Sequence, residues 1–223
     1  MINSPINQLI SVPAGEINLS GEFIIPVNSQ SLVIFSHGSG SSRFSTRNNF
    51  VARELHKQGI GTFLFDLLTK EEDMNYANRF NIELLSERLI VVTKYIRLLP
   101  AVSGLKIGYF GASTGAASAL RAAAALPDII DAVVSRGGRP DLAINIADKV
   151  KAPTLLIVGE KDYDVIEMNE TAYQKLQCKK KMEIVPDATH LFEEPGTLEK
   201  AASLAADWFS AHLKLKEEKL VNY

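Results

Sequence analysis

The sequence contains one cysteine, Cys178, among its 223 residues. A disulfide within these residues is therefore excluded, and so are metal and redox sites built on a CxxC motif. Cys178 stands beside lysines near the end of an expected helix. We interpret it as a half-exposed thiol without a role in function.

The sequence also lacks an excess of charge of either sign. Lys and Arg total 24 and Asp and Glu total 26, for a formal net charge of -2, so no strong long-range field would attract nucleic acid or anionic lipid. The N-terminal residues have no basic start and no apolar run of signal-peptide length. We expect a cytoplasmic protein with a small-molecule partner, and the choice between monomer and homodimer stays open.

A long hydrophobic run is missing as well. The most apolar stretch, Ala112 to Val134, is interrupted by an arginine, a proline and two aspartates, and a membrane span would tolerate these only at a high cost. Hydrophobic residues make up 46% of the chain and charged residues 22%, which is typical of a globular protein with a sizeable core. We therefore expect one domain over residues 1–223 and no membrane partner.

Short β-branched and aromatic runs alternate with segments of helical periodicity, which is typical of βαβ units. The expected strands are Ile17–Leu19, Glu22–Pro26, Ser31–Ser36, Gly61–Phe65, Lys106–Phe110, Ala132–Val134, Thr154–Val158 and Lys181–Val185. The first two are close enough to form a hairpin that turns at Ser20 and Gly21. The expected helices are Arg47–Gln58, Ile82–Leu99, Thr114–Leu126, Val165–Gln177 and Leu198–Lys214.

Several of these strands, among them LVIF, TFLF and TLLIV, are apolar throughout. Continuous apolar strands are expected where helices cover both faces of a parallel sheet. The fold class is therefore α/β, with a mostly parallel sheet. Functional groups in such sheets gather beyond the carboxyl ends of the strands. The last ten residues, KLKEEKLVNY, are typical of a solvated helix end or a frayed tail.

The expected strand KIGYF is followed by Gly111-Ala112-Ser113-Thr114-Gly115 and then by an alanine-rich helix. This is a GxSxG motif between a strand and a helix, where the turn places a serine hydroxyl at the sheet edge. Glycine at positions 111 and 115 avoids collisions in so sharp a turn. We predict that Ser113 is a nucleophile and that the Thr114 N–H binds an oxyanion at the helix N-terminus.

A serine hydroxyl needs a base to remove its proton, and the base needs a carboxylate to orient it. The expected strand TLLIV runs into Gly159-Glu160-Lys161-Asp162, and the strand KMEIV runs into the segment that ends at His190. Each side chain thus follows the carboxyl end of a strand, so the three groups can meet. We predict Asp162 as the acid and His190 as the base.

Other acids compete with Asp162 for this role. Asp164 is the main rival, and Asp187 and Glu160 are also near strand ends. Asp66 follows the strand TFLF and is interpreted as a loop or capping group. Asp162 has the offset from its strand end that suits the role best.

The chain has four histidines, and three of them suit the role of base less well than His190. His56 and His212 fall within expected helices and are predicted on helix surfaces. His37 directly follows the strand LVIF, and we predict that it holds a loop in place.

The loop His37-Gly38-Ser39-Gly40-Ser41-Ser42 allows a close approach of backbone to substrate. We predict the Ser39 N–H as the second oxyanion donor. A phosphate-binding loop is the alternative, but GxxxxGK[ST] is absent and Arg43 replaces the third glycine of GxGxxG. The pattern therefore favours an oxyanion loop.

The motifs SHGSG, GASTG, VGEKD and DATH occur in this order between about Ser31 and Phe192. As a set they resemble the α/β-hydrolase superfamily, and in particular its small dienelactone hydrolase-like branch. The resemblance implies an eight-stranded sheet with antiparallel first strands, an acyl-enzyme intermediate, and no metal or cofactor. Dienelactone hydrolases proper use a cysteine nucleophile, whereas this chain has Ser113. A small ester or lactone is therefore the expected substrate class.

Many relatives carry a helical lid after the sixth strand. Here about twenty residues precede the seventh strand, enough for one helix and no lid domain. The site should be open and suit small soluble esters. Arg136 and Arg139 lie near a strand end, and Arg43 and Arg47 follow the loop after the third expected strand. Their guanidinium groups could hold a substrate carboxylate or phosphate through paired hydrogen bonds. Surface or structural ion pairs are the alternative for these arginines.

The sequence thus predicts a serine-dependent hydrolase of small esters or lactones, with Ser113, Asp162 and His190 as its triad. Transfer of the acyl group to an alcohol or thiol would use the same residues. A non-catalytic binding protein on a hydrolase scaffold is the alternative from another functional class, because a fold alone does not determine function.

Overall fold

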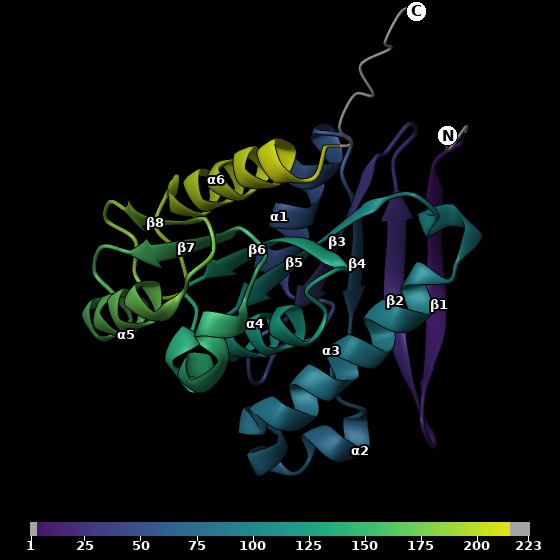
Figure 1. Ribbon diagram of the computed structural model, residues 1–223, viewed down its shortest axis with the longest axis horizontal. Coiled ribbons are helices and arrows are strands. Elements are labelled where there is room, and N and C mark those ends of the chain that lie inside the picture. Colours follow the sequence, from purple (N-terminus) through teal and green to yellow (C-terminus); the bar gives the residue numbers. More distant parts are fainter. Residues whose placement is uncertain (1–3, 215–223) are drawn as a thin grey trace, which may run out of the picture.

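A computed structural model describes residues 4–214. Eight strands form one sheet in the order β1-β2-β4-β3-β5-β6-β7-β8 (Figure 1). The strands are β1 (Ile6–Ala14), β2 (Ile17–Ile25), β3 (Ser31–Ser36), β4 (Gly61–Phe65), β5 (Lys106–Ala112), β6 (Ile130–Arg136), β7 (Thr154–Gly159) and β8 (Lys180–Val185). β2 pairs antiparallel with β1 and β4, and all other pairs are parallel. The α/β-hydrolase fold with a mostly parallel eight-stranded sheet is confirmed.

Helices cover both faces of this sheet. The longer ones are α1 (Thr46–Lys57), α3 (Ile82–Arg97), α4 (Thr114–Ala125), α5 (Tyr163–Lys175) and α6 (Thr197–His212), and the short ones are α2 (Lys70–Asp73), η1 (Tyr76–Phe80), η2 (Pro100–Val102) and η3 (Pro140–Lys149). α1 and α6 pack together on one face, and α3, α4 and α5 lie on the other (Figure 1). Among the described residues, no helix has the length and apolar character needed to cross a membrane.

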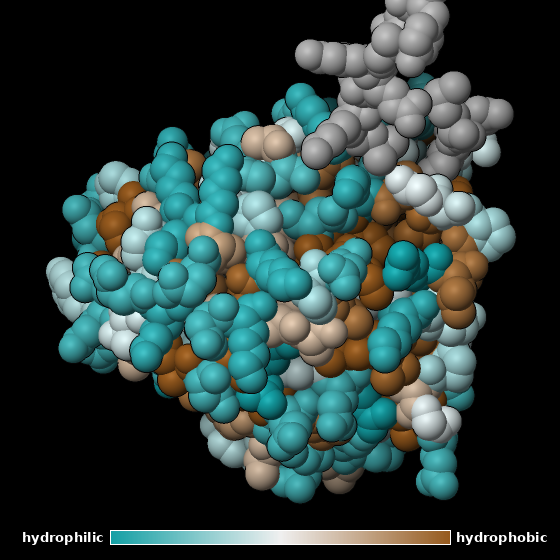
Figure 2. Space-filling view, viewed as in Figure 1, coloured by the Kyte–Doolittle hydropathy of each residue, from teal (hydrophilic) through white to brown (hydrophobic). Residues whose placement is uncertain are grey.

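The sheet separates two hydrophobic cores. Ile34, Tyr109 and Leu120 belong to the core under α3 and α4, whereas Val33 and Phe35 belong to the core under α1 and α6. Successive residues of β3 therefore point into different cores, as the period of two requires. This is why the central strands are apolar throughout. Figure 2 shows hydrophilic residues over most of one outer face, with hydrophobic ones surfacing on the side of the N-terminal strands.

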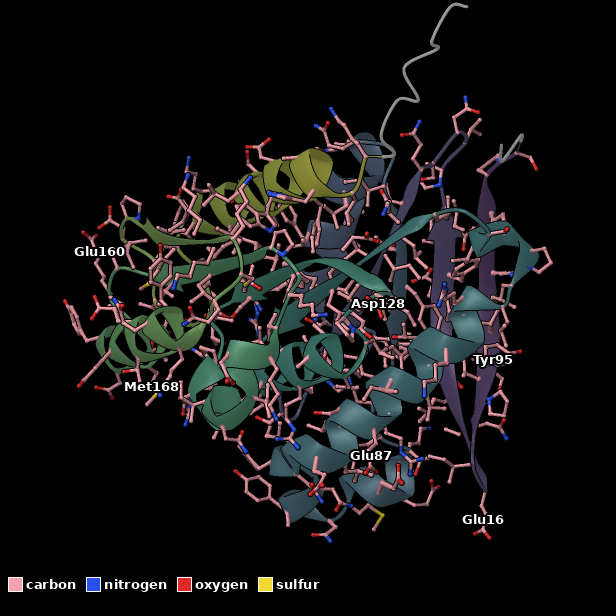
Figure 3. All side chains as sticks on the ribbon, viewed as in Figure 1. Glu16, Glu87, Tyr95, Asp128, Glu160 and Met168 are labelled. Carbon is pink, nitrogen blue, oxygen red and sulfur yellow. The ribbon has the colours of Figure 1, made fainter. Side chains whose placement is uncertain are left out.

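The predicted hairpin turn at Ser20 and Gly21 is wrong. Both residues lie inside β2, and the chain turns instead at Gly15, whose φ is +72°. Glu16 stands at the tip of this hairpin (Figure 3). Gly21 is required by packing, because a Cβ there would lie 2.1 Å from a ring atom of Phe63. A glycine can mark either a turn or a close contact within a strand, and Gly21 marks a close contact.

Other boundaries differ where local patterns are weak. β1 was not predicted, because its residues are largely exposed and lack a clear apolar alternation. β6 extends to Arg136, so this arginine ends the strand and does not follow it. The connection from β6 to β7 carries the 3-10 helix η3, which is kinked at Ala143 and packs on α4 and α5. Of the predicted tail KLKEEKLVNY, residues 215–223 lie outside the described part of the chain.

Candidate active site

Ser113 lies between β5 and α4 with a φ of 51°. This left-handed conformation is uncommon outside glycine and costs about 1–3 kcal/mol, so the surrounding structure must hold it. The Ser113 N–H donates to the Arg136 carbonyl at 3.3 Å, and the Arg139 N–H donates to the Ser113 carbonyl at 3.0 Å. Ser113 occupies the N-cap position of α4, but its hydroxyl makes no capping hydrogen bond. The hydroxyl is therefore available for chemistry.

The two glycines of the motif are required by contact, as predicted. A Cβ on Gly111 would lie 2.5 Å from the Ala116 Cα, and a Cβ on Gly115 would lie 2.1 Å from the Ser36 carbonyl oxygen. Gly38, in the loop after β3, faces the serine, because a Cβ there would lie 3.0 Å from the Ser113 Cβ. The lack of a side chain at position 38 thus lets this loop lie close to the nucleophile.

Asp162 and His190 meet across the ends of β7 and β8. The His190 Nδ1 and the Asp162 Oδ2 are 2.7 Å apart. Asp162 is the N-cap residue of α5, but its carboxylate makes no capping bond. The carboxylate is 14% exposed and the imidazole 38% exposed. This contact orients the ring so that Nε2 is the nitrogen left for other partners.

The rival acids lie elsewhere. Asp187 forms an exposed ion pair with Lys161 at 2.9 Å, and its N–H donates to Glu160 at 2.9 Å. Glu160 is exposed at the outer edge of the molecule (Figure 3). Asp164 is exposed in the first turn of α5. In the described part of the chain, none of these three acids forms a hydrogen bond or ion pair with His190.

The loop that carries His190 is braced on two sides. Thr189 donates from its N–H and its hydroxyl to Glu194, at 3.0 and 2.6 Å. On the other side lies Gly137, with a φ of 50°, where a Cβ would be 3.1 Å from the His190 carbonyl oxygen. The segment after β6 therefore packs directly against the backbone of His190.

His37 holds the loop after β3, as predicted. Its Nε2 accepts from the Leu67 N–H at 3.1 Å, so Nδ1 carries the hydrogen that is donated to the Gly38 carbonyl at 2.9 Å. Burial lowers the pKa of His37 below its ordinary value of 6.5, which favours this neutral form. His56 contacts Thr62 and is half-buried on α1.

The two predicted oxyanion donors are adjacent. The Ser39 N–H donates to the Thr114 Oγ1 at 2.9 Å. Thr114 is buried at the start of α4, and Ser39 is exposed. In this resting arrangement the donor from Ser39 is engaged by the Thr114 hydroxyl. Catalytic hydrogen bonds often reach their final partners only when substrate is bound.

A cavity of about 260 Å³ joins these elements. Its lining residues are Gly38, Ser39, Ser41, Ser45, Arg47, Asn48, Ala112, Ser113, Arg136, Gly137, His190 and Leu191. Ser113 and His190 share it, and its lining holds two arginines and no carboxylate. Within residues 4–214, no group of three His, Cys, Asp or Glu side chains is placed to hold a metal ion.

Three of the four candidate arginines, Arg43, Arg136 and Arg139, have different surroundings. Arg136 lines the cavity of Ser113. Arg43 pairs with Asp66, which fixes that loop, and it lines a neighbouring cavity of about 690 Å³. Arg139 donates to both carboxylate oxygens of Asp141 at 2.9 and 2.8 Å. For Arg43 and Arg139 the structure therefore favours the ion-pair alternative.

At the start of α1, sequence reasoning named Arg47 but not Ser45 or Asn48 as part of the site. Ser45 accepts from the Asn48 N–H at 3.3 Å and caps this helix, and both residues line the cavity together with Arg47. A serine three residues before an asparagine, directly after the glycine-rich loop, was the available signal. It indicates a second helix N-terminus at the site, beside that of α4.

Comparison with known proteins gives the family and the fold of the chain. The model of the dienelactone hydrolase family matches residues 21–217. The crystal structure of a dienelactone hydrolase from Anabaena variabilis is 50% identical, with a TM-score of 0.92 over 95% of this chain and 100% of that one. Est1E from Butyrivibrio proteoclasticus is 18% identical with a TM-score of 0.79, over 91% of this chain and 98% of that one, and shows the shared fold alone.

Curated relatives from two Mycobacterium tuberculosis strains are 53% identical over 204 residues, which is 92% of this chain. They bear the name "Putative phosphoribosyl transferase". The match covers 46% of their length, so the chain spans about half of each relative. With the family match over most of its length and the relative that is 50% identical, the chain belongs to the dienelactone hydrolase family.

Proposed function

We propose that the chain is a serine-dependent hydrolase of small esters or lactones that works through an acyl-enzyme. One observation carries the proposal. The His190 Nδ1 lies 2.7 Å from the Asp162 carboxylate, while His190 shares its cavity with the strained Ser113. A nucleophile, a base and a group that orients the base are the parts that acyl transfer requires.

In the proposed acylation, the Ser113 Oγ attacks the ester carbonyl and His190 Nε2 takes its proton. Asp162 accepts from the Nδ1–H and stabilises the imidazolium. The new oxyanion accepts from the N–H groups of Ser39 and Thr114. The C–O bond to the leaving group then breaks, and His190 gives that group the proton.

In the proposed deacylation, a water molecule attacks the acyl carbon and His190 takes a proton from it. The bond from Ser113 Oγ to the acyl carbon breaks, and the serine regains the proton from His190. Ser113 in place of the cysteine of dienelactone hydrolases proper supports a broad class of small esters or lactones. The proposed setting is the cytoplasm, and the proposed partner is this small molecule.

The test is intact mass after treatment with a fluorophosphonate, on wild type and on Ser113→Ala. We expect one covalent adduct on wild type and none on the variant. Absence of an adduct on folded wild type would contradict an activated serine and favour the binding scaffold. Phosphoribosyl transfer appears in the name of the curated relatives. It is not part of the proposal for this chain, because the match covers 46% of those proteins.

A further inference from the structure

Residues 136–139, at the end of β6 and just after it, contact the main chain of both the proposed nucleophile and the proposed base. The first residue of this segment accepts from the Ser113 N–H through its carbonyl at 3.3 Å, and the last donates its N–H to the Ser113 carbonyl at 3.0 Å. Between them, a Cβ on Gly137 would lie 3.1 Å from the His190 carbonyl oxygen. The position of this segment therefore influences how the serine and the imidazole lie relative to each other.

Asn169, on α5, joins this segment to a helix. Its side chain is fully buried, and its Nδ2 donates to the Gly138 carbonyl at 3.0 Å and to the Val165 carbonyl at 2.7 Å. Its Oδ1 is also buried and has no hydrogen-bond partner among the described residues. A buried amide with an unpaired oxygen costs free energy, and a leucine of similar size would avoid that cost. Packing alone therefore does not explain an asparagine at this position.

The helix that carries Asn169 begins at the proposed acid of the triad. Asp162 is the N-cap residue of α5, and Asn169 lies seven residues later, about two helical turns into the helix. α5 packs against η3, which directly follows residues 136–139, and against β7 (Figure 1). One helix thus connects the acid that orients His190 with the segment that contacts Ser113.

We propose that Asn169 is a positioning residue for Ser113. Its hydrogen bond to the Gly138 carbonyl holds residues 136–139 where they support the main chain of the serine. Ser113 has a φ of 51°, and such a conformation persists only where the surrounding contacts maintain it. Asn169 is not among the residues that line the cavity of Ser113, so it acts through this segment. The inference rests on the proposed hydrolase function and names a residue that aligns its nucleophile.

The test compares wild type with Asn169→Leu, which keeps a side chain of similar size and removes both hydrogen bonds. We expect the maximal rate of fluorophosphonate labelling of Ser113 to fall by about 10- to 100-fold, because a small displacement of a reacting group costs this much. The fluorophosphonate concentration that gives half of this rate should change little, since Asn169 does not line the cavity. The kcat/KM for p-nitrophenyl acetate should fall by a factor similar to that of the labelling rate.

Two further variants separate positioning from stability. Asn169→Thr keeps a donor to the Val165 carbonyl, because a threonine hydroxyl in a helix bonds four residues back, but it is too short to reach Gly138. Its labelling should be as slow as that of Asn169→Leu. Thr154→Val is the matched control, because Thr154 is buried at the start of β7, opposite the site, and its hydroxyl donates to the Ala152 carbonyl at 3.0 Å. It should lower the Tm by a few degrees, as Asn169→Leu does, and leave labelling unchanged.

The inference is overturned if either Asn169 variant is labelled as fast as wild type, or if Thr154→Val loses as much activity at an equal loss of Tm. Should Asn169→Leu fail to fold, Asn169→Thr carries the comparison. Wild type distinguishes the two proposals. If Ser113 is labelled in wild type and equally fast in the Asn169 variants, the inference fails and the hydrolase proposal stands. If folded wild type is not labelled, both fail.

Discussion

The N–H of Ser39 donates to the hydroxyl of Thr114, with 2.9 Å between N and Oγ1. The hydrogen bond joins the loop after β3 to the first residue of α4. Both residues are proposed oxyanion donors through their N–H groups. The oxyanion of a bound substrate must therefore compete with the Thr114 hydroxyl for the Ser39 donor.

Replacement of Thr114 by valine tests this competition. Thr114→Val keeps the shape and the backbone N–H, so we expect faster fluorophosphonate labelling of Ser113, by up to about fivefold if the freed hydrogen bond contributes about 1 kcal/mol. Stability should fall by about 1 kcal/mol in urea unfolding. Thr114→Ser keeps the hydroxyl and should match wild type in both. Slower labelling in Thr114→Val would instead assign the hydroxyl a positioning role for Ser39.

Asp162→Asn should lower kcat for ester hydrolysis by about 10³- to 10⁴-fold, because an amide no longer stabilises the imidazolium or its tautomer. Asp164→Asn is the matched control, two residues further along and exposed. It should keep kcat within about twofold, since surface changes have small effects. Steady-state kinetics on a p-nitrophenyl ester measure both. Comparable losses in the two variants would contradict the assignment of Asp162.

Gly115→Ala should destabilise the fold by about 1–3 kcal/mol or more, although alanine is the better helix former by about 1 kcal/mol. Its Cβ would lie 2.1 Å and 2.5 Å from the carbonyl oxygens of Ser36 and His37, and backbone cannot yield as a side chain can. Ala125→Ser, at the exposed end of the same helix, should stay within about 0.5 kcal/mol. Urea unfolding measures both, and equal stabilities would refute the contact argument.

The lowered pKa of His37 gives the protein a defined sensitivity to acid. Below about pH 6.5 an unfolded chain binds a proton at His37 while the folded chain resists it, because burial lowers the pKa there. The unfolded state then holds more protons, so stability is present above this pH and falls as the pH decreases. The loss cannot exceed about 1.4 kcal/mol per pH unit for one group.

His37→Gln should therefore have a shallower decrease in stability than wild type between about pH 6.5 and pH 5. The variant removes the titrating group, and other groups contribute equally to both proteins. Urea unfolding at several pH values gives the two slopes. His56→Gln serves as a comparison, because burial also lowers the pKa of His56, though it is only half-buried. Parallel slopes for His37→Gln and wild type would be incompatible with a neutral buried His37.

The central strands could be predicted because they are fully buried, and full burial requires a run of mostly apolar residues. β3, β4 and β7 are apolar at nearly every position, and each boundary was predicted to within one residue. The elbow at Ser113 was predictable because a GxSxG motif between a strand and a helix marks such a turn. Gly111 avoids a contact with Ala116 in the same turn, whereas Gly115 avoids the Ser36 carbonyl oxygen of β3, which only the tertiary structure brings close. The residues that meet at the site come from strand ends, so strand prediction also placed them.

The features that could not be predicted depend on contacts between residues far apart in the sequence. A glycine is needed at position 21 because the ring of Phe63 in β4 lies against it. Only the order of the strands in the sheet brings the two residues together. The difference between Arg136 and Arg139 is likewise one of tertiary structure. Within residues 4–214, the buried Arg136 side chain has no hydrogen-bond partner at Nε or Nη1, whereas Arg139 pairs with Asp141. The candidate arginines could not be told apart by sequence, and only the fold distinguishes their environments.

The main-chain carbonyl of Arg136 accepts a hydrogen bond from the Ser113 N–H, and Arg136 also lines the cavity of the nucleophile. A carbonyl is present whichever residue occupies the position, so exchange of the side chain leaves the support of Ser113 in place. Support of the nucleophile and the lining of its cavity are then separate properties of one position. Variants at position 136 can therefore differ in the shape and charge of this cavity while they keep the same serine turn.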